Sequence, residues 1–280
     1  MAERIIQADD AELCTESFGD PSASPLLLIA GIGSSMLWWE EGFCRLLADR
    51  DRFVIRYDHR DTGRSTTYEV GSPGYTADDL DADALAVLDA YDVSAAHLVG
   101  VSAGGGIAQL LALDHPGRVR SCVLISTTRA VPGGRDLPPP TDEFMRFVST
   151  AEVDWSSKES VIEYLVEYMR VLAGAERPFD ESAARDFVRR DVERAHDIAA
   201  TQNHDSLAEG DRQRAPLGSI ESPVLVVHGT ADPMFPLAHG EALADEIPGA
   251  RLLTLSGAGH GVYREDWETL AGAIAEHTAY

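Results

Sequence analysis

The sequence has few basic residues and a large excess of acidic ones. Lys and Arg number 23 against 47 Asp and Glu, which gives a formal net charge of -24. A surface this acidic repels the phosphates of nucleic acids and the head groups of anionic lipids. Neither nucleic acid nor a membrane is therefore an expected partner, and a neutral or cationic small molecule approaches more easily than an anionic one.

Cysteines are also few, and long apolar runs are missing. Cys14, Cys44 and Cys122 are odd in number and widely spaced, so neither a disulfide framework nor a metal-binding pattern is expected. No stretch of 18 apolar residues is present, and residues 1–10 lack the apolar segment of a signal peptide. These features predict a cytoplasmic protein without a transmembrane helix.

The rest of the sequence alternates between short apolar runs and segments with helical periodicity. Its 280 residues fit one α/β domain with an insertion. Strands are expected at residues 3–6, 12–18, 26–30, 53–57, 96–101, 119–126, 224–229 and 251–255. Helices are expected between them at residues 41–48, 76–91, 105–113, 237–247 and 267–277. This alternation predicts a mostly parallel sheet with helices on both faces.

The alternation stops between residues 127 and 222, a stretch far too long for an ordinary connection. Ser156-x-x-Glu159 resembles a capping box in front of an apolar helical stripe, and a second helix is expected at 181–200. We therefore predict a core domain made of residues 1–127 and 222–280, with residues 128–221 inserted as a helical cap.

Gly100-Val101-Ser102-Ala103-Gly104 matches the pattern G-x-S-x-G. This short pattern is a weak signal alone, but here it follows a buried strand and precedes a helix. That is the context of a nucleophile elbow, where small flanking residues let strand and helix approach closely. The pattern therefore predicts Ser102 as a nucleophile.

A serine nucleophile needs a general base, and the base needs an acid to orient it. Asp232 follows the strand at 224–229 and His260 follows the strand at 251–255, in the chain order Ser, acid, His. The flanking glycines and the position past a strand end favour His260 over His228, which we expect to support the Asp232 loop. The predicted triad is Ser102, Asp232 and His260.

Hydrolysis through a tetrahedral intermediate also needs two backbone N–H donors for the oxyanion. One is expected from Ala103, directly after the nucleophile. The other is expected from the glycine loop that follows the strand at 26–30, at Ile32. Ile32 and Ala103 are therefore the predicted oxyanion donors, and this chemistry requires neither a metal nor an organic cofactor.

With these residues in place, the chain resembles the α/β-hydrolase superfamily over nearly its full length. The segment from Ile55-Arg56-Tyr57-Asp58 to Gly63-Arg64-Ser65 resembles the aclacinomycin methylesterase branch. So do Glu3-Arg4-Ile5 and Phe18-Gly19-Asp20-Pro21. Two positions depart from the common superfamily pattern, Ala30 where His is usual and Asp61 where Gly is usual. The first departure removes a side chain that often braces the oxyanion loop.

The resemblance implies hydrolysis of an ester on a bulky small molecule of the polyketide or macrolide type, with the cap supplying specificity. One of Trp38 and Trp39 is expected to pack under the oxyanion loop and the other to face the substrate. The candidate substrate-binding residues are Gly31, Trp38, Phe144, Trp155, Tyr168 and Met169.

The same triad also serves other reactions. A lactonase, an amidase, a hydrolase of carbon–carbon bonds and a cofactor-free perhydrolase therefore stay open as alternatives. A receptor that holds a small ligand under the cap without turnover stays open as well. The sequence leaves the oligomeric state undecided between a monomer and a small homo-oligomer.

Overall fold

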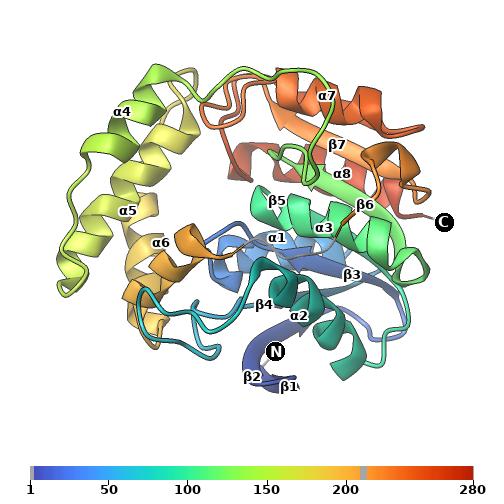
Figure 1. Cartoon of the computed structure of the whole chain (residues 1–280), viewed down its shortest axis with the longest axis horizontal. Helices are drawn as coiled ribbons and strands as arrows, with labels where there is room; N and C mark the ends of the chain where they lie inside the picture. Colours follow the sequence, from blue (N-terminus) through green and yellow to red (C-terminus); the bar gives the residue numbers. More distant parts are fainter. Residues whose placement is uncertain (1–2, 209–212, 280) are drawn as a thin grey trace.

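The computed structural model describes residues 3–208 and 213–279, and an eight-stranded sheet forms its centre (Figure 1). The strand order is β1-β2-β4-β3-β5-β6-β7-β8. The strands are β1 (Arg4–Ala8), β2 (Ala11–Phe18), β3 (Ser24–Ile29), β4 (Arg52–Tyr57), β5 (Ala96–Val101), β6 (Val119–Ile125), β7 (Val224–Gly229) and β8 (Arg251–Leu255). Only β2 runs antiparallel to its neighbours, β1 and β4.

Helices cover both faces of this sheet, and the predicted α/β-hydrolase architecture is confirmed. Buried side chains of α2, α3 and α7 share one core cluster, and those of α1 and α8 share the cluster on the other face. The bounds are α1 (Glu41–Ala48), α2 (Ala77–Ala90), α3 (Ala103–Asp114), α7 (Ala238–Glu246) and α8 (Trp267–His277). Among the described residues, no helix is both long enough and apolar enough to cross a membrane.

The register of the parallel strands brings several loops to one edge of the sheet. Val101 at the end of β5 pairs with Ile125, Ile125 pairs with Val227, and Gly229 at the end of β7 pairs with Leu255. The loops that leave these strands therefore start side by side. In open α/β sheets the carboxyl edge is where ligands bind.

Between β6 and β7 the chain builds a separate layer of helices, seen beside the sheet in Figure 1. It contains α4 (Asp142–Thr150), α5 (Lys158–Ala173), α6 (Glu181–Arg194) and the 3₁₀ helix η3 (Ile198–Ser206). Apolar residues of α5 and α6 pack into a small core of their own, which also includes Leu37. We call residues 128–221 the cap segment; residues 209–212 within it lie outside the described part of the chain.

The helices of the cap segment differ in two respects from the sequence prediction. Helix α4 was not predicted, although its apolar residues Phe144, Met145, Phe147 and Val148 recur at helical spacing; Phe144 is its one buried residue, while Met145 and Val148 are half-exposed. Helix α6 ends at Arg194 and not at residue 200.

The predicted capping box between Ser156 and Glu159 is not formed. Ser157 caps α5, whereas the side chain of Ser156 bonds to Asp154.

The departure at Asp61 has a structural reason. Asp61 lies in the left-handed region, with φ of 61°, where glycine is the residue without strain. Its carboxylate accepts hydrogen bonds from Tyr68 N–H at 2.6 Å, Tyr75 Oη at 2.7 Å and Asn203 Nδ2 at 3.0 Å. Because Asn203 belongs to η3, the aspartate ties this loop of the core to the cap segment.

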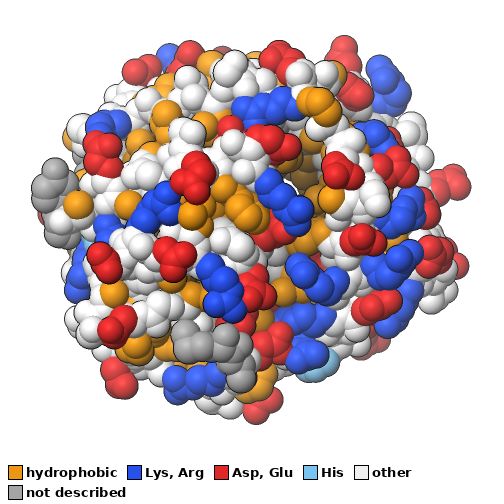
Figure 2. All heavy atoms as spheres, turned by 180° about the vertical axis from the view of Figure 1, so that it is seen from behind, with side chains coloured by type: hydrophobic (Ala, Val, Ile, Leu, Met, Phe, Trp, Pro, Cys, Tyr) orange, Lys and Arg blue, Asp and Glu red, His pale blue; other side chains and the backbone are white. Residues whose placement is uncertain are grey.

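The acidic residues do not form one block on the face seen in Figure 2, where acidic and basic side chains are interspersed. Many arginines are paired with carboxylates, such as Arg185 with Glu163 and Arg177 with Asp266. The net charge of -24 therefore acts as a diffuse field that favours solubility.

Candidate active site

Ser102 occupies a strained turn between β5 and α3. Its backbone has φ of 54° and ψ of -123°, a conformation that non-glycine residues rarely adopt outside functional sites. A Cβ at Gly100 would lie 2.1 Å from the Gly104 carbonyl oxygen, and one at Gly104 would lie 2.2 Å from that of Ile29. The glycines of the motif are therefore required by the close approach of strand and helix, as the elbow pattern predicts.

Asp232 and His260 are brought together by the loops after β7 and β8. His260 Nδ1 donates to Asp232 Oδ2 at 2.9 Å, while Oδ1 accepts from the N–H groups of Met234 at 2.9 Å and Phe235 at 2.8 Å. Burial opposes ionisation of Asp232, but His260 and these hydrogen bonds outweigh it and hold the pKa of Asp232 below its usual range. Asp232 is thus an ionised partner that fixes the His260 ring through Nδ1 and makes no hydrogen bond to Nε2.

Helix α5 also holds the His260 loop. The His260 N–H donates to the Leu172 carbonyl oxygen at 2.7 Å, and the Tyr263 hydroxyl donates to the His260 carbonyl oxygen at 3.0 Å. A Cβ at Gly259 would lie 2.1 Å from that same Leu172 oxygen, which explains the glycine before the histidine.

The rival histidine, His228, has a supporting position. Its Nε2 donates to the Phe235 carbonyl oxygen at 2.7 Å and lies 3.6 Å from Asp232 Oδ2. Burial lowers the pKa of His228, so the ring is neutral at ordinary pH. It therefore braces the Asp232 loop, as we expected.

The loop after β3, which carries the predicted oxyanion donor, lies against the nucleophile. A Cβ at Gly31 would lie 3.4 Å from Ser102 Cβ, and Ile32 is 44% exposed at this loop. Ala103 begins α3, so its N–H belongs to the first turn, where backbone donors have no partner inside the helix. As oxyanion donors, Ile32 and Ala103 remain predictions.

The side chain missing at position 30 is replaced by braces from elsewhere in the chain. His59 Nε2 donates to the Ala30 carbonyl oxygen at 3.1 Å, and the Gly33 N–H donates to His204 Nδ1 at 2.8 Å. Both histidines are buried, and neither is close to the loop in sequence.

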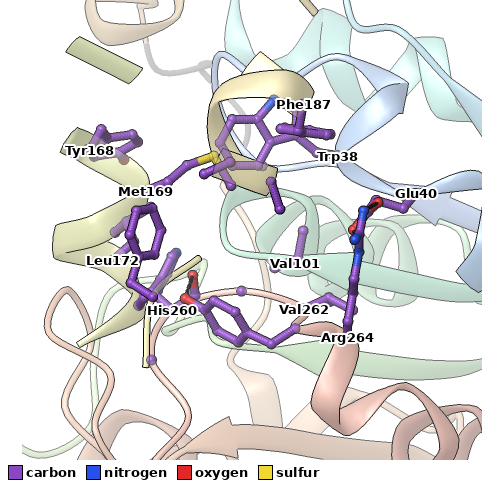
Figure 3. A pocket seen from close by; sticks show the side chains of 18 of the residues that line it. Trp38, Glu40, Val101, Tyr168, Met169, Leu172, Phe187, His260, Val262 and Arg264 are labelled. Carbon is purple, nitrogen blue, oxygen red and sulfur yellow. Dashed lines mark hydrogen bonds and ion pairs between the residues drawn. The ribbon is translucent and has the colours of Figure 1, made fainter. Parts of the chain in front are cut away.

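Ser102 and His260 open on one cavity of about 270 Å³, shared by the sheet edge and the cap segment. In Figure 3, His260 and Val262 lie on one side of this cavity, and Trp38, Met169 and Phe187 lie on the other. In residues 3–208 and 213–279, no three His, Cys, Asp or Glu side chains are grouped so that they could hold a metal ion.

The family model described as "alpha/beta hydrolase fold" matches residues 24–266. The chain belongs to the α/β-hydrolase family. It is 38% identical to a rhodomycin D methylesterase of Streptomyces sp. strain C5, over 99% of this chain and 98% of that protein. It is 36% identical to a rhodomycin D methylesterase of Streptomyces peucetius, again over 99% and 98%.

Solved structures agree on the architecture. An esterase from a Rhodococcus species superposes with a TM-score of 0.80 at 24% identity, covering all of this chain and 99% of the other. This likeness shows the fold, while the methylesterase relatives show the branch of the family. The protein is a carboxylic ester hydrolase of that family.

The cavity lining contains only part of the predicted set of substrate-binding residues. Gly31, Trp38, Tyr168 and Met169 line the cavity. Trp38 meets Phe187 edge to face at a ring distance of 5.3 Å, whereas Trp39 is buried and stacks on Phe43.

The predictions for Phe144 and Trp155 are corrected, since neither side chain is part of the cavity lining. Phe144 packs behind the lining residues of α5, in a cluster with Val171 and Leu172. Trp155 packs against Tyr164 at a ring distance of 5.9 Å. Both are aromatic residues packed within the cap, Phe144 on α4 and Trp155 in the turn before α5.

Several lining residues were not identified from the sequence. Phe187 lies on α6, within the predicted helix at 181–200, and was not singled out as a lining residue. Glu40 and Arg264 form an ion pair at the cavity edge, with Oε1 and Nε 2.9 Å apart (Figure 3). They are 224 residues apart, and no local pattern links them.

Proposed function

We propose that this hydrolase cleaves a methyl ester on a polyketide of the rhodomycin type through an acyl-enzyme on Ser102. The observation that carries the proposal is that Ser102 and the His260 ring, hydrogen-bonded to Asp232, line the same cavity, which aromatic side chains also line. The identity of 36% and 38% to rhodomycin D methylesterases, over nearly the whole of each chain, supports the substrate class.

In the proposed reaction, His260 Nε2 takes the proton from the Ser102 hydroxyl as its oxygen attacks the ester carbonyl. The N–H groups of Ile32 and Ala103 hold the oxyanion. His260 then protonates the leaving methanol oxygen, and a water activated by the same ring releases the acid. Asp232 keeps the proton on Nδ1 and stabilises the imidazolium, which agrees with its lowered pKa.

We also propose that residues 128–221 act as the specificity cap of the enzyme. The support is that α5 and the start of α6 supply apolar side chains to the cavity, among them Met169, Leu172 and Phe187. A flat aromatic substrate would bury its rings against these side chains, while the ester would meet the core residues.

The experiment combines labelling with turnover. A fluorophosphonate probe should label the wild-type protein and the Ser34→Ala variant, which removes another hydroxyl of the cavity, but not Ser102→Ala. Methanol release should then follow from methyl esters of polycyclic polyketides. Labelling of Ser102→Ala would refute the nucleophile. Faster turnover of lactones or carbon–carbon substrates would refute the methyl ester, and tight binding without turnover would indicate a receptor.

A further inference from the structure

The loop predicted to hold the oxyanion is fixed by groups from the cap segment. Gly33 in this loop and His204 in η3 are 171 residues apart, and the hydrogen bond between them joins the core to the cap. His204 is only 3% exposed. Nothing in the proposed reaction sequence uses this histidine.

The two bonds of the His204 ring have fixed polarity. Nδ1 faces the Gly33 N–H at 2.8 Å, and Nε2 faces the Arg60 carbonyl oxygen at 2.8 Å. A backbone N–H can only donate and a carbonyl can only accept, so Nδ1 is the acceptor and Nε2 carries the proton. The ring is therefore neutral, and burial lowers the pKa of His204 in agreement with this tautomer.

The bond to Gly33 controls the orientation of a neighbouring peptide. Gly33 has φ of 66° in a turn that the Ser34 N–H closes by donating to the Gly31 carbonyl oxygen at 3.2 Å, outside any helix or strand. Its N–H belongs to the same rigid peptide plane as the Ile32 carbonyl. A hydrogen bond that fixes this peptide plane limits the rotation of the Ile32 backbone. The Ile32 side chain is half-exposed, so its packing adds little to hold the backbone in place.

We propose that His204 is a positioning residue that, from the cap segment, holds the oxyanion loop so that the Ile32 N–H points at the reacting carbonyl oxygen. The proposal rests on the function proposed above, in which Ile32 is one of the two donors. A second cap residue acts on the same loop: Asp191 accepts from Ser35 Oγ and, at 3.0 Å, from Trp38 Nε1. The cap and the oxyanion loop are thus one hydrogen-bonded unit.

Two substitutions separate the bonds of the ring. His204→Asn keeps an acceptor at the position of Nδ1, whereas His204→Gln keeps a donor at the position of Nε2 and loses the acceptor for Gly33. We expect His204→Asn to retain kcat within about threefold. We expect His204→Gln to lower kcat by about 10- to 100-fold with KM nearly unchanged. A misaligned donor reduces the stabilisation of the transition state without weakening the binding of the substrate. The matched pair His115→Asn and His115→Gln, at the far end of α3, should leave both constants unchanged.

The rate of Ser102 labelling by a fluorophosphonate and the hydrolysis of p-nitrophenyl acetate are the readouts. Both need the oxyanion donors but not the natural methyl ester. A wild-type protein that reacts with neither would refute the proposed function and, with it, the role of His204. A wild-type protein that reacts with both leaves the His204 variants to test that role alone. Equal loss of kcat in His204→Asn and His204→Gln, a rise in KM instead, or no loss in His204→Gln would overturn the proposal. Thermal unfolding of all variants shows whether each is folded.

Discussion

The cavity has two sides that are built by different means. On the core side, Ser102, Asp232 and His260 are held by strand ends, close glycine contacts and hydrogen bonds to buried groups. On the cap side, Tyr168, Met169 and other apolar side chains are held by packing between helices. The first kind of support fixes the positions of individual polar atoms, whereas the second sets the shape and volume of the cavity.

Under the proposed function, the core side carries out the reaction and the cap side selects the substrate. Substitutions on the core side should change kcat, because they remove interactions made in the transition state. Substitutions on the cap side should change the preference for one ester over another, because they remove contacts with parts of the substrate that do not react. His204 and Leu172 are exceptions, since these cap residues bond to the loops of the core side.

The largest effect is expected from Asp232→Asn. The amide has nearly the same shape, but it favours the wrong tautomer of His260 and cannot stabilise the imidazolium, so kcat should fall by about 10³- to 10⁴-fold. KM should change little, since Asp232 lies behind the histidine and outside the cavity lining. Steady-state kinetics with a p-nitrophenyl ester provide the measurement.

The control for this prediction is Asp245→Asn, an exposed carboxylate on α7 paired with Arg135. It should keep wild-type kcat. If Asp232→Asn loses less than about tenfold, the carboxylate does not orient the base, and the two sides of the cavity would not differ as proposed.

Most of the core could be predicted from the sequence because its signals are local. The apolar runs closed by glycines mark the strands, and Gly100 to Gly104 marks the turn through the steric contacts of its glycines. Asp232 and His260 were found by chain order and by their position past strand ends. The structure places this pair in hydrogen-bond contact.

The cap could be predicted only as a helical insertion. The helix α4 carries apolar residues at helical spacing, but it is only nine residues long and follows Pro138-Pro139-Pro140, so it was not separated from the loop before it. Phe144 on α4 and Trp155 in the turn before α5 contact neighbours within the cap, whereas Tyr168 and Met169 on α5 reach the cavity, and this difference depends on tertiary packing. Contacts such as Gly33 with His204 or Asp61 with Asn203 span more than 140 residues and leave no pattern of spacing.

The next effect concerns stability and lies in the sheet. His97 on β5 is buried, with Nδ1 against Ser121 Oγ at 2.8 Å, and burial lowers its pKa from 6.5 to about 4. Between these values the unfolded chain binds a proton that the folded protein does not. The contribution of His97 to the free energy of unfolding should therefore be fully present above pH 6.5 and should fall by up to about 3 kcal/mol as the pH drops to 4.

His97→Asn tests this contribution because it keeps a partner for Ser121 and does not titrate. The slope of unfolding free energy against pH should flatten in the acid window and stay parallel to wild type above pH 7, measured by urea unfolding. Parallel curves throughout would mean that His97 has the same pKa in the folded and unfolded states. Its burial in the sheet would then not lower the free energy of unfolding at low pH.

The smallest effect tests the cap side. Met169→Ala removes a side chain that lines the cavity, and it should lower kcat/KM for a bulky polycyclic methyl ester by about tenfold. Hydrolysis of p-nitrophenyl acetate should be unaffected, since a small ester does not reach α5. Competition between the two esters in one reaction measures this ratio directly.

Met145→Ala is the matched control, because Met145 lies on α4 with 48% of its surface exposed and does not line the cavity. It should leave the ratio unchanged. If Met169→Ala slows both esters equally, the cap side supports the reacting atoms as the core side does. Selection and chemistry would then not be divided between the two sides, and the packing of α5 on the His260 loop through Leu172 would be the route by which the cap acts.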